Sequence, residues 1–375
     1  MILLSGILAA SAVGTCFAGE LMTFGGKDEF SVFTISGGRW ESERGGIAAS
    51  RPVAVVESRE LRTRSVFDQV IVSWNAFTPP GASIDIECRA RRDAGEWTRW
   101  YALGTWNTSG CDRARTSVKG QKDERGRVDT DTLVLTSPAN ALAVRFRLRC
   151  SADGASPVLR FAAVSAVDSR KSGSKPKSAT SRGSSGANRK PEAWGTQLPV
   201  PRLSQLSVEG GRPWCSPTST AMVLGYWSAK LNRPELSVGI ADAARAVHDE
   251  AWGGTGNWVF NTAYAGEFEG IRAYVARLRG IADIEKWISR GVPVILSLDY
   301  NELNRRGAGR SMGHLVVVVG FTPSGDPIIN DPWARLENGE SVRKVFPRAD
   351  LDRAWLGSTG SLGTVYLIYP ETLDR

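Results

Sequence analysis

The sequence predicts two domains, an N-terminal all-β sandwich of jelly-roll type over residues 20–167 and a C-terminal α+β domain over residues 194–375. Short alternating strands separated by turn residues fill the first region. In the second region, helical segments come first and apolar β-branched strands follow. Residues 168–193 are rich in Ser, Gly and Lys, cannot bury apolar area and should form a flexible linker. A chain of 375 residues is long enough for this plan.

The first 18 residues are apolar and resemble a secretory signal peptide, with the small residues Cys16 and Ala18 placed before Gly19. Two alternatives are a lipoprotein signal acylated at Cys16 and an uncleaved apolar N-terminal strand. No later run is long enough for a membrane-spanning helix, so no integral membrane segment is expected in the mature chain. The sequence therefore predicts an exported protein that is periplasmic, at the cell surface or extracellular.

The positive charge is concentrated in the linker. The formal net charge is +8, and residues 169–190 contain seven basic residues and no acid. The folded parts should thus be near neutral, which argues against a nucleic-acid partner. A basic linker suits contact with anionic cell-wall polymers or lipid head groups.

Two strands of the N-terminal domain alternate cleanly, Ser83–Arg91 and Val144–Cys150. The alternation turns Cys88 and Cys150 toward the core, where they would form a disulfide if their strands are neighbours, or remain as two buried thiols. Cys111 lies in a predicted loop and would be the odd cysteine.

No metal-ligand spacing or catalytic pair stands out in the N-terminal domain, and no metal or cofactor is expected. Its tryptophans would either pack in the core or form an exposed row that stacks on sugar rings. These are Trp40, Trp74, Trp97, Trp100 and Trp106. We interpret the domain as an accessory module that targets the protein, with a cell-wall glycan or a protein as its partner.

The elements expected in the C-terminal domain are a helix at Val238–Ala251, a cleft-lining loop at Trp252–Gly266, helices at Glu269–Arg279 and Ile281–Arg290, and strands at Val292–Leu298, Leu315–Phe321, Val342–Phe346 and Thr364–Tyr369. The glycines and aromatic residues of the 252–266 loop suit a substrate-gripping segment, or a loop packed on the core. Trp214, Trp258 and Asn257 are the candidate substrate-binding residues.

Cys215 is the candidate nucleophile. It lies where a loop runs into a predicted helix, with Ser216 placed to cap the helix and Pro217 suited to its first position. The free N–H groups and the dipole at a helix N-terminus favour the thiolate. A nucleophilic cysteine needs a base, and the chain has only two histidines.

His314 is the candidate base. It directly precedes a buried strand, and the turn Thr322–Gly325 returns the chain toward Asp331. Antiparallel pairing should bring His314 opposite a residue within about two positions of Asp331. His248 instead falls on an amphipathic helix and should be an ordinary surface residue.

Three blocks resemble the bacteriocin-processing (C thirty-nine) branch of the papain-like cysteine peptidases: Trp214–Ser219, Gly313–Gly320 and Asn330–Pro332. The resemblance covers residues 198–369 and implies a papain-like fold. Ser216 stands where the family usually has glycine. The family also has a glutamine upstream of the cysteine that stabilises the oxyanion, and Gln205 is the matching candidate.

The resemblance implies an exported cysteine peptidase with the triad Cys215, His314 and Asp331, acting on a peptide or protein substrate. Leader processing coupled to export is not expected, since the sequence has neither a Walker loop nor transmembrane helices. Two alternatives stay open. The same triad could act as an amidase or acyltransferase on a non-protein or cell-wall peptide substrate, or the domain could be an inactive peptidase-like binding protein.

Overall fold

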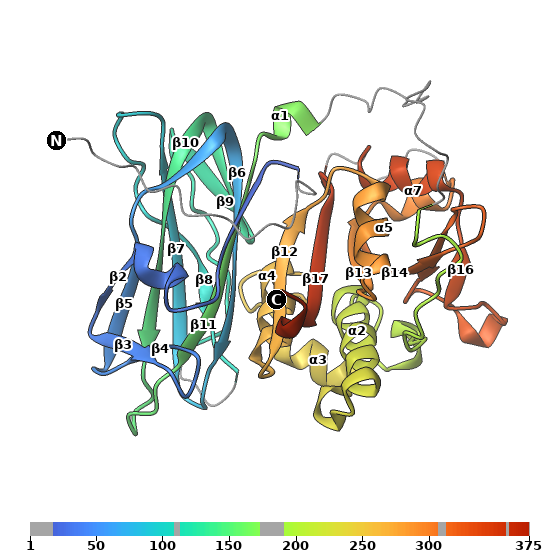
Figure 1. Ribbon diagram of the computed structural model, residues 1–375, viewed down its shortest axis with the longest axis horizontal. Coiled ribbons are helices and arrows are strands. Elements are labelled where there is room, and N and C mark those ends of the chain that lie inside the picture. Colours follow the sequence, from blue (N-terminus) through green and yellow to red (C-terminus); the bar gives the residue numbers. More distant parts are fainter. Residues whose placement is uncertain (1–17, 109–112, 173–190, 307–312, 358–359, 375) are drawn as a thin grey trace.

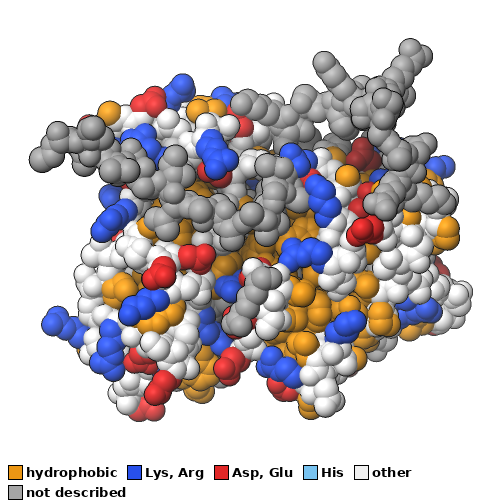
Figure 2. Space-filling view, viewed as in Figure 1, with side chains coloured by type: hydrophobic (Ala, Val, Ile, Leu, Met, Phe, Trp, Pro, Cys, Tyr) orange, Lys and Arg blue, Asp and Glu red, His pale blue; other side chains and the backbone are white. Residues whose placement is uncertain are grey.

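The computed structural model describes residues 18–108, 113–172, 191–306, 313–357 and 360–374. The predicted signal peptide, Cys111 and most of the predicted linker lie outside these residues. Figure 1 shows strands filling one half of the molecule and a mixed sheet-and-helix layer filling the other. Acidic and basic side chains are interspersed over both halves (Figure 2). Among the described helices, none is long and apolar enough to cross a membrane.

The N-terminal half is all-β. Its strands are β1 (Glu20–Phe24), β2 (Phe33–Ser36), β3 (Gly38–Glu41), β4 (Gly46–Ala49), β5 (Val53–Ser58), β6 (Leu61–Phe77), β7 (Ser83–Arg91), β8 (Tyr101–Trp106), β9 (Gly126–Asp129), β10 (Thr132–Arg149) and β11 (Val158–Val167). Hydrogen bonds join all eleven into one sheet. The sheet curls because the long strand β10 pairs with β6 and β9 over its first part and with β5 and β7 over its last part.

The curled sheet encloses an aromatic core. Trp74, Trp106 and Tyr101 are among its largest fully buried side chains, together with Phe67 and Phe146. Each of these large aromatic side chains removes apolar area from water, at roughly 25 cal/mol per Å². Core packing is therefore the role of Trp74 and Trp106, as one of the two sequence interpretations had it.

The predicted disulfide between Cys88 and Cys150 is absent, and both thiols are free. Their strands β7 and β10 are neighbours, but Cys88 lies opposite Val144 while Arg149 lies opposite Ser83. The two cysteines are thus about six residues apart along the sheet, roughly 20 Å at the rise of a strand and far beyond disulfide reach. Burial raises the pKa of the Cys88 thiol to about 12.

The linker begins with one short helical turn, α1 (Ser169–Ser172). The C-terminal half then contains the helices α2 (Cys215–Leu231), α3 (Ile240–Val247), α4 (Trp258–Glu267), α5 (Ile281–Ser289), α6 (Tyr300–Leu303) and α7 (Arg348–Trp355). Its strands are β12 (Ile271–Arg277), β13 (Val294–Leu298), β14 (His314–Phe321), β15 (Pro327–Asn330), β16 (Arg343–Val345) and β17 (Thr364–Pro370). They form an antiparallel sheet in the order β12-β17-β13-β14-β15-β16. The domain is mixed α+β, as predicted.

Two expectations for this half were wrong. Most of the segment expected as a loop at Trp252–Gly266 is helix α4, which Asn257 caps by accepting a hydrogen bond from the Phe260 N–H. The helix expected at Glu269–Arg279 is strand β12, which pairs with β17 along all seven of its residues. Charged residues mixed with alanine imitate a helix there, but pairing and burial decide the outcome.

Strand β12 ends the sheet on one side, and the N-terminal domain completes it. Asn75 on β6 donates from Nδ2 to the Ala273 carbonyl (2.6 Å) and accepts the Ala273 N–H at Oδ1 (3.0 Å). The Val275 N–H donates to the Ser73 hydroxyl at 3.0 Å. Helix α4 packs beside this contact, with the ring of Phe260 5.5 Å from Trp106. The two domains therefore share a buried, hydrogen-bonded interface.

Substitution of Asn75 by Ala should destabilise the protein by about 3 kcal/mol, because it leaves the N–H and C=O groups of Ala273 buried without partners. Chemical denaturation of the full chain measures this effect. The exposed Asn338 provides a matched control, and its replacement by Ala should change stability by less than about 0.5 kcal/mol. Equal stabilities of the two variants would contradict the role assigned to Asn75.

Candidate functional site

Cys215 is the first residue of α2, so the helix begins two residues earlier than predicted: Trp214 is the capping residue, and the Thr218 N–H bonds to its carbonyl at 3.0 Å. Ser216 and Pro217 lie inside the first turn and are fully buried. The thiol therefore lies at the positive end of a 17-residue helix.

His314 begins β14 and meets Asp331 at the end of β15, as the predicted hairpin required. The His314 Nε2 atom lies 2.7 Å from the Asp331 Oδ1 atom, and both side chains are buried. The turn at Thr322–Gly325 closes through the Gly325 N–H and the Thr322 carbonyl. Asp331 is held in turn by the Trp333 N–H, which donates to Oδ1 at 3.0 Å. The predicted proximity of His314 and Asp331 is confirmed.

The Cys215 thiol and the His314 ring interact at the cleft, and each shifts the pKa of the other. Burial by itself would raise the pKa of the thiol, but the hydrogen bond and charge of His314, with the N–H groups of Leu315 and Ser216, outweigh it and leave the pKa lowered. Burial opposes the imidazolium too, yet Asp331 and Cys215 raise the pKa of His314. This environment favours a thiolate–imidazolium pair. With Nε2 on Asp331, the Nδ1 nitrogen is left for Cys215.

Ser216, which replaces the usual glycine of the resembled family, has a partner of its own. Its hydroxyl lies 2.9 Å from the hydroxyl of Tyr366 on β17, and both side chains are fully buried. The added side chain therefore fits under the first turn of α2 without entering the reactive centre.

Gln205 lies beside the loop that carries Cys215, and its side chain amide bonds to that loop rather than pointing at the reactive centre. Its Nε2 donates to the carbonyls of Gly211 and Arg212, and its Oε1 has no hydrogen-bond partner among the described residues. The side chain is buried and also lines the cleft next to Cys215. In this arrangement its N–H groups bind the loop that carries Cys215, and they are not directed at an oxyanion.

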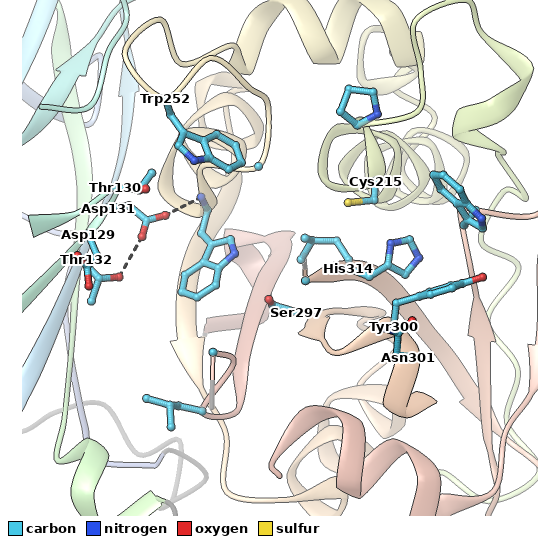
Figure 3. A pocket seen from close by; sticks show the side chains of 18 of the residues that line it. Asp129, Thr130, Asp131, Thr132, Cys215, Trp252, Ser297, Tyr300, Asn301 and His314 are labelled. Carbon is cyan, nitrogen blue, oxygen red and sulfur yellow. Dashed lines mark hydrogen bonds between the residues drawn. The ribbon is translucent and has the colours of Figure 1, made fainter. Parts of the chain in front are cut away.

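Cys215 and His314 open into a cleft of about 810 Å³ between the two domains. The β9–β10 turn of the N-terminal domain forms the wall opposite Tyr300, with Cys215 between them (Figure 3). Asp131 in this turn accepts a hydrogen bond from the Trp258 N–H at 2.7 Å and so joins the wall to α4. Sequence reasoning missed this wall, because only the docking of the domains brings it to the site.

Tyr300 is a second feature that the sequence interpretation missed. Its ring contacts the His314 ring edge-on, with centroids 5.0 Å apart and planes at 83°. Trp333 lies behind it, 6.4 Å between centroids. Trp333 directly follows the Asn-Asp-Pro block, and this position was the available signal in the sequence that it lies near the site.

The three candidate substrate-binding residues have different outcomes. Trp258 lines the cleft, and so does its neighbour Trp252, which is 48% exposed. Trp214 is half-buried beside Gly210 and is not among the residues that line the cleft. Asn257 is fully buried, where it caps α4 and donates to Asp249 at 2.8 Å. The prediction that Asn257 contacts substrate is wrong, because its buried side chain already forms these two structural hydrogen bonds.

The exposed row of tryptophans, the other of the two interpretations for the N-terminal domain, does not form. Trp97 and Trp100 are half-buried under the guanidinium groups of Arg89 and Arg145, at 4.6 and 3.8 Å from the ring centroids. Trp40 packs against the core beside Phe30. Stacking on a sugar would first require the arginines to move.

His248 is exposed at the end of α3, as predicted. Only its backbone carbonyl takes part in a described contact, accepting from Arg115.

The fold and this cluster define a two-domain protein with a cysteine–histidine–aspartate site at the domain boundary. Residues 197–361 match the family described as Peptidase C39 like, and residues 38–167 match the Peptidase C39 N-terminal domain. The C-terminal domain therefore belongs to the C39-like peptidase family, and the N-terminal domain is of the type found with it. This membership suggests that the protein is a peptidase.

Comparisons with individual proteins give weaker likenesses. A C39-like peptidase structure from Bacillus anthracis is 17% identical, covers 46% of this chain and 96% of its own, and has a TM-score of 0.33. The carbohydrate-binding module CBM32 of AlyQ, solved with 4,5-unsaturated mannuronic acid, is 10% identical over 40% of this chain and 98% of its own, with a TM-score of 0.17. TM-scores this low carry no argument for this chain. The search of curated proteins finds no match.

Proposed function

We propose that this protein is an exported cysteine peptidase that hydrolyses peptide bonds through Cys215, His314 and Asp331, on a papain-like C-terminal domain. The observation that carries the proposal is the meeting of the Cys215 thiol with the buried His314–Asp331 pair, in which His314 Nε2 lies 2.7 Å from Asp331 Oδ1. Membership in a peptidase family agrees with it. Export rests on the apolar N-terminal segment alone.

In the proposed reaction the Cys215 thiolate attacks the scissile carbonyl carbon, forming a C–S bond and an oxyanion. Collapse of this intermediate breaks the C–N bond, and the His314 imidazolium gives its proton to the leaving amine. Water then attacks the thioester while His314 takes its proton, and collapse of this second intermediate breaks the C–S bond and releases the acid and the thiol. Asp331 holds the tautomer and orientation of the ring. The Cys215 N–H, which has no hydrogen-bond partner among the described residues, is the oxyanion donor that we favour over Gln205.

The substrate should be a peptide, free or in a cell-wall cross-link. Incubation with a peptide library, followed by mass spectrometry of new termini, tests the proposal. New termini that disappear in the Cys215→Ala variant support it, and their absence from every peptide would oppose it. An added amine acceptor separates the alternatives: capture of the acyl group by the amine would indicate an acyltransferase, and an amidase would release ammonia or an amine from a non-peptide amide.

We further propose that the N-terminal domain acts as the second wall of the cleft. Asp131 is buried, which raises its pKa to about 6, and it bonds to Thr132 as well as to Trp258. A role in glycan binding, as first expected, stays a second proposal for this domain, and it would have to use a surface other than a tryptophan row.

Replacement of Asp131 by Ala should raise KM about tenfold, because the N–H of Trp258 loses its partner and the Trp258 side chain loses its fixed place in the cleft. Steady-state kinetics measure this. The rate at which iodoacetamide labels the Cys215 thiol should change by less than about twofold. The exposed Asp153 on the same domain is the control, and its replacement by Ala should leave KM unchanged. Equal KM values for all three proteins would contradict the proposed wall.

A further inference from the structure

The two ends of the cleft differ in charge. At the end formed by the N-terminal domain, cations and anions are matched: Arg127 pairs with Asp129 at 2.9 Å, and the buried Arg277 is attracted by Asp131. This end therefore offers a substrate no free charge of either sign.

The end near Tyr300 and Trp333 carries unmatched arginines. The guanidinium of Arg212 lies over the Trp333 ring at 5.6 Å, and that of Arg306 lies over the Tyr300 ring at 5.1 Å. Since the two rings contact each other and Tyr300 contacts His314, both cations belong to one stack that ends at the reactive centre. Figure 3 shows Tyr300 beside His314 and on the far side of Cys215 from Asp131.

Stacking on an aromatic ring orients a guanidinium but leaves its charge and its N–H groups available. Among the described residues, neither Arg212 nor Arg306 forms an ion pair with a carboxylate, and neither does the nearby Arg335, which also lines the cleft. Glu340 is 3.7 Å from Lys344 and accepts a hydrogen bond from the backbone N–H of Arg335 at 3.2 Å. Burial, Asp331 and Glu340 raise the pKa of Tyr300, and the charges of Arg306 and Arg335 act on the same ring in the opposite direction.

We infer that this end of the cleft binds a carboxylate of the peptide substrate, so that the enzyme prefers acidic peptides. The inference rests on the proposed function and names its substrate class. Planar, oriented guanidinium groups match a carboxylate in two-pronged hydrogen bonds. The carboxylate would belong to an acidic side chain or to the C-terminus of the peptide, and both sources present the same group.

Pairs of otherwise identical cleavable peptides test the inference. One pair exchanges Glu for Gln, and a second exchanges a C-terminal acid for its amide. We expect kcat/KM to favour the acid about tenfold in at least one pair, which also identifies the source of the carboxylate. The preference should fall to about unity in the double variant Arg212→Gln, Arg306→Gln, and it should shrink as salt is raised. The variant Arg245→Gln, on the exposed face of α3, should keep it.

Equal kcat/KM for acid and amide in both pairs would overturn the inference and leave the peptidase proposal intact. If no peptide is cleaved, binding of the same fluorescent peptides to the Cys215→Ala protein is measured by anisotropy. Tighter binding of the acid that depends on the two arginines would support the site even though the peptidase proposal had failed. Equal binding of acid and amide would overturn the site.

Discussion

Replacement of Cys215 by Ala should reduce peptide hydrolysis by about 10⁴-fold or more, because the only nucleophile of the proposed mechanism is lost. The side chain is partly buried at the first turn of α2, and alanine suits that helical position. The fold should therefore survive, with a melting temperature within about 3 °C of the parent. Initial rates on a cleaved peptide, with melting curves for both proteins, measure the two effects.

Cys150 provides the matched control. It is a free and partly exposed thiol whose Sγ donates to the Arg51 carbonyl at 3.4 Å. Replacement of Cys150 by Ala should leave hydrolysis within about twofold of the parent. Substantial activity in the Cys215→Ala protein would refute the proposed nucleophile, whereas loss in both variants would indicate a structural rather than a chemical cause.

Removal of the His314 ring should have the second largest effect, on the reactivity of the Cys215 thiol. The pKa of Cys215 is lowered chiefly by its hydrogen bond to His314 and by the charge of that ring, which overcome burial. In the His314→Ala variant the N–H groups of Leu315 and Ser216 remain against the larger effect of burial, and the pKa should rise to its ordinary value near 9 or above it. The labelling rate at pH 7 should then fall about 100-fold.

The pH dependence of labelling gives the sign of this effect. A thiol below its pKa gains about tenfold in thiolate for each pH unit, so the variant should react about 100-fold faster at pH 9 than at pH 7. In the proposed thiolate–imidazolium pair the parent thiol is already ionised at pH 7, so its rate should change less than about threefold over the same range. Iodoacetamide labelling, with the Cys215 peptide quantified by mass spectrometry, measures both. The same steep rise in both proteins would contradict an activated thiolate.

The reactive cluster could be predicted because its determinants are local. His314 and Asp331 lie on one hairpin whose turn residues stand in the sequence, and Cys215 lies at a loop-to-helix boundary marked by Pro217. Short-range patterns of this kind determine spacing without knowledge of the rest of the fold. The alternating strands of the N-terminal half could be predicted for the same reason, although the partners of β10 could not.

The missed features depend on contacts between segments far apart in sequence. Strand β12 was taken for a helix because its burial comes from β17 on one side and from the N-terminal domain on the other. The cleft wall around Asp131 was missed because nothing near it in sequence relates it to Cys215. A Cys88–Cys150 disulfide was one of two possibilities because alternation gives the face of a residue but not its position along the sheet.

The side-chain contacts that Asn75 and Ser73 make to β12 have a further consequence for solubility. An open strand edge is a template for pairing with another chain, and proteins protect such edges against aggregation. Here the protection is supplied by another domain, so a copy with a misfolded or missing N-terminal half would expose the amides of Ala273 and Val275 beside the apolar face of α4. Such a copy should associate edge to edge with others of its kind. The N-terminal domain thereby shields the edge of its neighbour from such pairing, and the yield of unaggregated protein becomes a sensitive readout of the contact.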